Sequence, residues 1–160
     1  MKWNVSYSSY DELLDVTLIV EQDSLSGLWF FNAQVDGSTI VYRSAADKPT
    51  AEKAMRAAET WYEQGEYKVQ RTTEKRFQTL EWIGSYWPDA MALPDGNPSQ
   101  FTREAVAQGD VLERRYGDGG TGYEITDQGL LKLAADRCPA CGKQLYGARS
   151  HPWHAAEHKA

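Results

Sequence analysis

The chain has 160 residues, of which 41% are hydrophobic and 25% are charged, and its formal net charge is −6. This composition is typical of a globular protein of one domain or two small ones, and it excludes a disordered chain, a collagen-like chain and a disulfide framework. It also excludes a uniformly basic protein that coats nucleic acid, although one local basic face stays possible. No targeting or membrane-spanning segment is evident, so we expect a cytoplasmic protein without membrane contact.

Residues 1–67 are predicted to form a small α+β unit. A capping-box pattern that begins at Ser9 predicts a short helix over residues 9–15. Alternation and β-branching then predict a three-stranded antiparallel sheet. Its strands cover residues 16–20, 28–35 and 38–43. The dipeptide Asp36-Gly37 predicts a tight hairpin turn between the last two strands.

A second helix of this unit is predicted between Pro49 and Gly65, because its apolar residues recur at helical spacing. The resulting order, helix, three-stranded meander, helix, resembles the double-stranded-RNA-binding fold. Such domains carry a lysine cluster at the start of the last helix. Residues 48–54 hold two lysines and one acidic residue here, and the unit as a whole is acidic. We therefore expect a scaffold, a dimerisation unit or a protein-binding surface rather than RNA binding.

Residues 68–137 are predicted to form a second domain. The first helix covers residues 73–86 and is followed by a proline- and glycine-rich break. Ser99 is expected to cap a helix that stops at Gly109. The remaining elements alternate around a glycine-rich tip at residues 117–122. They are strands over residues 111–116 and 123–126 and a closing helix over residues 127–135.

Two stretches of this part, residues 102–116 and 123–131, resemble the second half of a winged helix-turn-helix domain. In that family a recognition helix ends at a glycine, and a strand with two arginines leads into the wing. The resemblance implies that the helix enters the major groove of DNA while the wing touches phosphate. The residues that it assigns to nucleic-acid contact are Gln100, Thr102, Arg103, Arg114 and Arg115.

Other interpretations of the same residues stay open. Winged helices also serve as protein–protein modules, and residues 68–137 are acidic overall. Arg114 or Arg115 can simply pair with nearby carboxylates such as Glu113 or Asp118. One contiguous basic face would favour nucleic-acid binding, whereas scattered ion pairs would favour a protein-binding adaptor.

Residues 138–160 are predicted to form a zinc-stapled segment. Both cysteines and all three histidines of the chain lie here. Cys138 and Cys141 are separated by two residues, twelve more precede His154, and three separate it from His158. A CxxC turn and two histidines four positions apart on a helix make a closed tetrahedral site for structural Zn²⁺, and this spacing resembles that of a two-Cys, two-His zinc finger. His151 is an alternative ligand.

The last segment is also the only part with more basic than acidic residues, so Lys143 and Arg149 join the predicted nucleic-acid-binding residues. A flexible tail or a redox-active CxxC are the competing interpretations of this segment. No catalytic motif is recognisable, and a closed zinc shell leaves no open coordination position, so we expect a protein without enzymatic activity.

Together these patterns predict a small regulator of bacterial or phage type that binds DNA or a DNA-bound protein complex. The alternative is an acidic phage-type inhibitor or adaptor, in which the negative surface binds a protein partner or mimics nucleic acid. Either protein would use the acidic first unit, residues 1–67, as its protein-facing surface.

Overall fold

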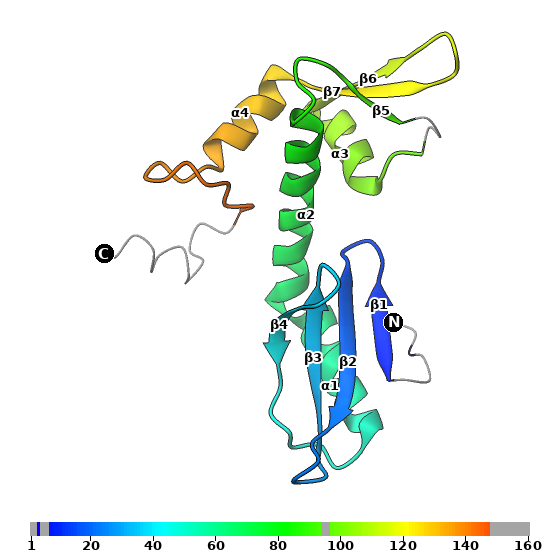
Figure 1. Ribbon diagram of the computed structural model, residues 1–160, viewed down its shortest axis with the longest axis vertical. Coiled ribbons are helices and arrows are strands. Elements are labelled where there is room, and N and C mark those ends of the chain that lie inside the picture. Colours follow the sequence, from blue (N-terminus) through cyan, green and yellow to red (C-terminus); the bar gives the residue numbers. More distant parts are fainter. Residues whose placement is uncertain (1–2, 4–6, 94–96, 148–160) are drawn as a thin grey trace. The chain divides into compact units, whose positions relative to one another are not determined.

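The computed structural model describes residue 3 and residues 7–93 and 97–147. The chain forms two compact units, residues 1–69 and 70–160, and the boundary falls inside helix α2, Glu66–Gly84. The predicted α+β class is confirmed, because the described residues form helices and two antiparallel sheets (Figure 1).

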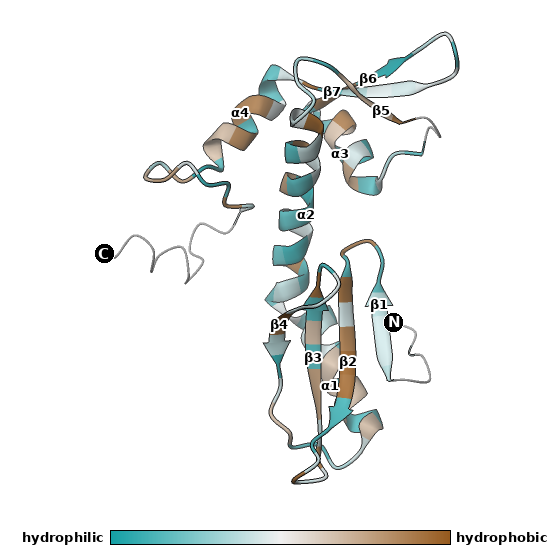
Figure 2. Ribbon diagram, in the orientation of Figure 1, coloured by the Kyte–Doolittle hydropathy of each residue, from teal (hydrophilic) through white to brown (hydrophobic). Residues whose placement is uncertain are grey.

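The N-terminal unit is a four-stranded meander with one helix packed on it. The strands pair in the order β1-β2-β3-β4 and cover Ser8–Asp11, Val16–Gln22, Trp29–Val35 and Thr39–Arg43. Helix α1, Ala51–Gln64, lies on one face of this sheet. Alternate residues of β2 and β3 point toward the helix and are buried. The core on this face contains Val16, Leu18, Val20, Phe31, Ala33, Ala54, Ala58 and Tyr62, and Figure 2 shows the hydrophobic colour concentrated on β2.

The predicted helix over residues 9–15 is wrong, because this stretch begins with an edge strand. Ser9 pairs with Leu18 of β2, and the backbone turns only after Asp11. The Asp11 carboxylate accepts a hydrogen bond from the Leu14 amide at 3.2 Å, so it stabilises a turn in place of the capping box that Ser9 suggested. The sheet therefore has four strands rather than three.

The other predicted elements of this unit are confirmed with small changes in their ends. Asp36 and Gly37 both adopt positive φ, 51° and 86°, as a tight hairpin turn requires. The side chain of Thr50 caps α1 by accepting from the Lys53 amide, and Gly65 ends the helix. Because the first element is a strand and not a helix, the order of elements no longer matches that of the double-stranded-RNA-binding fold.

The C-terminal unit combines helices with a three-stranded sheet of order β5-β7-β6. Its strands cover Met91–Leu93, Val111–Arg115 and Thr121–Ile125, and its helices α3 and α4 cover Gln100–Gln108 and Asp127–Ala135. Together with α2 these elements enclose one core. Its buried members are Leu80, Ile83, Met91, Ala105, Val111, Tyr123, Ile125 and Leu133.

Helix α3 and the two strands that follow it match their predictions closely. Ser99 caps the helix by accepting from the Thr102 amide, and Gly109 ends it in the left-handed conformation at φ 84°. Helix α2, in contrast, starts seven residues before the predicted position, and the short strand β5 was not predicted at all.

Only residues 94–99 separate β5 from α3. Of these, the structure describes residues 97–99, and none of them is helical. A complete helix-turn-helix has a further helix just before its recognition helix, and the described residues contain none at this point. The sequence resemblance therefore extends to the helix, hairpin and closing helix from α3 to α4.

Candidate functional site

A hollow of about 630 Å³ lies between α3 and the β6–β7 hairpin. Arg103 reaches it from α3, while Glu113 and Arg115 reach it from β6. Its remaining walls come from the loop before α3, the hairpin tip and β7, and include Asn97, Tyr116, Thr121 and Tyr123. The structure thus brings two of the predicted nucleic-acid-binding arginines to one concave surface.

The charges in this hollow do not cancel. Arg115 Nε lies 3.4 Å from Glu113 Oε1, and both side chains stand on the same face of β6. The guanidinium of Arg103 is exposed and forms no ion pair with any described residue. One carboxylate therefore faces two guanidiniums, which leaves the hollow with a local positive charge inside an acidic protein.

Tyr123 forms the floor of the hollow and reports this electrostatic environment. It is only 2% exposed. Burial raises the pKa of its phenol and Glu113 raises it further, while Arg115 and Arg103 oppose the rise. Both arginines therefore act on the same phenol, although one comes from α3 and the other from β6.

Arg114 lies on the opposite face of β6 from Arg115, because successive side chains of a strand alternate. Its Nε donates to Glu124 Oε2 of the neighbouring strand at 2.7 Å. Tyr116 lies so close to Gly122, the partner of Arg114 in β7, that a Cβ on Gly122 would lie 2.6 Å from the tyrosine oxygen. Arg114 and Arg115, which are adjacent in the sequence, therefore lie on opposite faces of the sheet.

The structure buries the side chain of Thr102, which the sequence placed among the residues that meet base edges. The residue is 1% exposed, and its hydroxyl lies 3.0 Å from that of Ser99. It belongs to the cap that fixes the start of α3. Gln100 is exposed as expected, and its side-chain amide donates to Glu104 at 3.2 Å.

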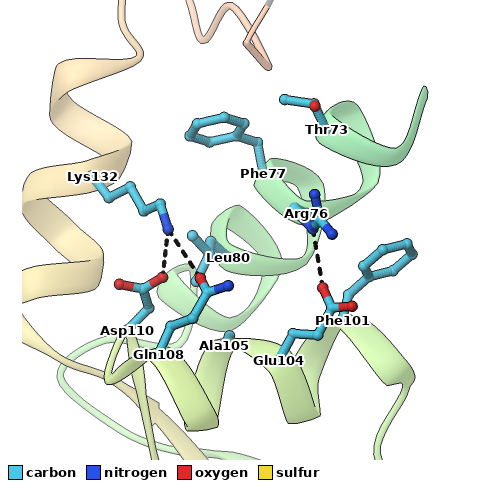
Figure 3. Close-up of a pocket in the computed structure, with 10 residues that line it drawn as sticks. All are labelled: Thr73, Arg76, Phe77, Leu80, Phe101, Glu104, Ala105, Gln108, Asp110 and Lys132. Carbon is cyan, nitrogen blue, oxygen red and sulfur yellow. Dashed lines mark hydrogen bonds and ion pairs between the residues drawn. The ribbon is translucent and has the colours of Figure 1, made fainter. Parts of the chain in front are cut away.

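A second cavity of about 320 Å³ lies between α2, α3 and α4 and contains none of the predicted site residues (Figure 3). Phe77, Leu80, Phe101 and Ala105 make its walls apolar. Its charged groups are paired across the rim. These pairs are Arg76 with Glu104 at 3.0 Å and Lys132 with Asp110 at 2.8 Å.

These two ion pairs join α2 to α3, and α4 to the residue that precedes β6. Hydrogen bonds from Arg76 and then from Gln100 lower the pKa of Glu104. Asp110 is 1% exposed and also accepts from Gln128 Nε2 at 2.8 Å. No sequence pattern indicated the contact of Arg76 with Glu104 or the contacts of Asp110 with α4, since these join residues 18 to 28 positions apart.

The two predicted cysteine ligands lie in a tight turn after α4. The Gly142 amide donates to the Cys138 carbonyl at 2.7 Å, and the Cys138 amide donates to the Lys143 carbonyl at 2.8 Å. Gly142 has a φ of 74°, which closes the turn. Neither cysteine forms a disulfide, and Cys138 is buried while Cys141 is exposed. A turn of this kind, with two cysteines that form no disulfide, suits the first half of a zinc site.

The other predicted ligands, His154 and His158, lie outside the described residues, as do the alternative His151 and the predicted contact Arg149. Lys143 is described and is exposed beside the cysteine turn. Among residues 7–93 and 97–147, no cluster of three or more His, Cys, Asp or Glu side chains could hold a metal ion. A zinc site at the cysteine turn would therefore need ligands from outside the described residues.

The segment after the cysteines is anchored on the rest of the unit. Asp136 accepts from the Gly147 amide at 2.8 Å and from Gln144 at 2.7 Å. Burial, together with a hydrogen bond to Glu81, raises the pKa of Tyr146 to about 12. Gly147 packs so closely on α2 that a Cβ there would lie 2.5 Å from a methyl group of Thr73. These contacts hold residues 144–147 against α2 and the end of α4.

Comparison of the chain with family models, with curated proteins and with solved structures finds no match. Within the part of the chain that the structure describes, no helix is both long enough and apolar enough to cross a bilayer.

Proposed function

We propose that the C-terminal unit binds duplex DNA, alone or within a DNA-bound protein complex, as a winged-helix-like module. The observation that carries the proposal is that Arg103 of α3 and Arg115 of β6 line one hollow. In this arrangement α3 and the hairpin lie on the two sides of a phosphate chain. Exposed Gln100 lies one turn away from Arg103, where it can reach a base edge.

Arginine suits this role because its planar guanidinium donates two parallel hydrogen bonds to a phosphate. The ion pair between Arg115 and Glu113 is long, 3.4 Å, and Arg115 is 86% exposed. Exposed pairs of this kind contribute about 0–1 kcal/mol, so a phosphate can displace the carboxylate at small cost. Arg114 has a shorter pair on the other face and takes no part in the proposed contact.

We further propose that a structural Zn²⁺ staples the C-terminal segment through Cys138, Cys141, His154 and His158. The cysteine turn, in which the two residues form no disulfide, supports the first two ligands. Four protein ligands would close the coordination shell, so the ion would add folding energy rather than catalysis. Lys143 and Arg149 would then extend the cationic surface of this segment.

The DNA proposal is tested by fluorescence anisotropy with a labelled 20-base-pair duplex at low salt. Arg103→Gln and Arg115→Gln should each weaken binding. Lys75→Gln, which removes the same charge from α2 outside the hollow, should leave the affinity unchanged. Equal losses in all three variants would show that only net charge matters, and the hollow would then not be the site.

A second candidate function is a protein-binding adaptor or inhibitor, and the ion pairs favour it. Several cations of the C-terminal unit face carboxylates, in the pairs Arg76–Glu104, Arg114–Glu124, Arg115–Glu113 and Lys132–Asp110. Such pairs neutralise the surface that a polyanion would need. This protein would show no salt-dependent affinity for the duplex and would be retained strongly on an anion exchanger.

A further inference from the structure

Strand β4 forms one edge of the sheet in the N-terminal unit, and every one of its five residues is exposed. Three neighbouring side chains on it are large and apolar. They are Ile40, Val41 and Tyr42, which are 51%, 40% and 39% exposed. An edge strand presents backbone groups that can pair with another extended chain. Natural proteins usually place charge on such edges. Here the three middle residues are apolar, and the one charged residue, Arg43, donates a hydrogen bond to Asn32.

A groove of about 570 Å³ lies beside this edge, between the end of β4 with its following loop and helix α1. Phe31 and Tyr42 line it from the sheet, and Ala57 and Trp61 line it from the helix. A groove between an edge strand and a helix is the geometry in which proteins bind an extended peptide by adding it to their sheet.

The aromatic wall of this groove is held in one conformation by stacking. The rings of Tyr42 and Trp61 are stacked, with centroids 4.6 Å apart and planes 18° apart. Trp61 also stacks on Tyr67, with ring centroids 5.3 Å apart, and Phe31 packs against both Tyr42 and Trp61. A wall that is already ordered loses little conformational entropy when a ligand binds.

The rim of the groove carries positive charge. Arg56 lines it, is exposed and makes no ion pair with any described residue. Lys48 also lines it and pairs with the exposed Asp47 at 3.1 Å. An acidic side chain of a ligand would therefore find a guanidinium that pairs with no described carboxylate, since Asp47 at the same rim pairs with Lys48.

We infer that this groove binds an extended peptide segment of a protein partner, paired along β4. An aromatic or aliphatic side chain of the peptide enters the hollow against Tyr42 and Trp61, and a neighbouring carboxylate pairs with Arg56. The acidic excess of the unit disfavours a nucleic-acid strand, whose many phosphates need many cations. A single carboxylate of a peptide needs only one cation.

The β-bulge in the pairing of β3 with β4 favours a short peptide over a second copy of the chain. The register shifts between Ala33 and Gln34, opposite residues 40–42. A bulge twists an edge strand, which hinders pairing of two whole edges and leaves one short stretch accessible. This peptide site belongs to the N-terminal unit and does not depend on DNA binding by the other unit.

The test uses blocked, fluorescein-labelled octapeptides of alternating valine and threonine with a central phenylalanine followed by glutamate. Anisotropy should show saturable binding to the full-length protein, and backbone NMR shifts should be confined to β4, its following loop and α1. Arg56→Gln should weaken binding about tenfold, as expected for one charge-assisted contact. Lys53→Gln, on the same helix but outside the groove, should leave binding unchanged.

Two altered peptides make the test specific. Replacing the glutamate by glutamine should lower the affinity by the same factor and should remove the effect of Arg56→Gln. N-methylation of the residue that pairs with β4 should abolish binding, since it removes the backbone donor. The inference would be overturned if the peptide did not bind, or if binding persisted after N-methylation. It would also be overturned if the protein preferred an oligo(dT) strand, or if it formed a dimer that Tyr42→Lys abolished.

Discussion

The Tyr62 hydroxyl donates a hydrogen bond to Asp11 Oδ2 over 2.5 Å and so joins helix α1 to strand β1, 51 residues earlier in the chain. Tyr62 has no exposed surface, and Asp11 points toward the helix from the strand that was predicted as a helix. Through its other oxygen, Asp11 also accepts from the Leu14 amide. This one carboxylate therefore fixes both the end of β1 and its position against α1.

Tyr62→Phe should lower the free energy of unfolding by about 1–3 kcal/mol, because the Asp11 carboxylate loses a buried donor. Urea denaturation followed by circular dichroism measures the change. Tyr10→Phe is the matched control, since Tyr10 is 55% exposed and its hydrogen bond to Asp15 lies at the surface. A Tyr62 variant as stable as the Tyr10 variant would show that this hydrogen bond does not stabilise the unit.

The same phenol predicts a loss of stability at alkaline pH. Burial, and then the hydrogen bond to Asp11, raise the pKa of Tyr62 well above its ordinary value of 10. A raised pKa means that the stabilisation is complete below about pH 10, where the phenol is protonated in both states, and decreases as pH rises further. Unfolding free energies measured between pH 8 and 11 should fall above pH 10. Part of that fall should be absent in Tyr62→Phe.

Gly129→Ala should destabilise the C-terminal unit, although alanine is normally better than glycine inside a helix by about 1 kcal/mol. A Cβ on Gly129 would overlap the Asp110 carbonyl and lie 2.7 Å from Ile125 Cγ1. We expect a net loss of about 1–3 kcal/mol from this overpacking. The control is Gly117→Ala, where a Cβ meets nothing within 4 Å. A stabilising effect of Gly129→Ala would mean that α4 packs less closely on Asp110 and on Ile125 of β7.

Metal analysis tests the zinc proposal. Protein purified without added metal should contain about one zinc per chain, and Cys141→Ser should abolish it because the site loses a thiolate. Comparison of His154→Ala with His151→Ala identifies the third ligand, since only the true ligand should reduce the zinc content. Protein that holds no zinc and melts at the same temperature with and without a chelator would contradict the proposal.

The elements that follow from local rules were predictable from the sequence. Alternation gave β2 and β3, the Asp36-Gly37 dipeptide gave the hairpin, and Ser99 and Gly109 gave both ends of α3. The helix at residues 9–15 failed for a non-local reason. Ser8–Asp11 pairs with β2 and bonds to Tyr62, and these tertiary contacts override the local capping pattern.

The candidate site was predictable only in part, for the same reason. The sequence placed Arg103 at the start of a helix and Arg115 beside a hairpin, but the hollow that they share is a tertiary feature. Strand alternation could have separated Arg114 from Arg115, since neighbours in a strand point to opposite faces. The buried state of Thr102 had no local signal, because it depends on packing.

The salt dependence of duplex DNA binding tests the central claim most directly. Anisotropy titrations of one labelled duplex between about 50 and 200 mM salt give the slope of log affinity against log salt concentration, which counts the phosphates that the protein neutralises. We predict a steep negative slope for the intact protein and a slope smaller by about 1 for Arg103→Gln and for Arg115→Gln. No measurable affinity at 50 mM salt, or a slope that neither substitution changes, would contradict DNA binding through this hollow.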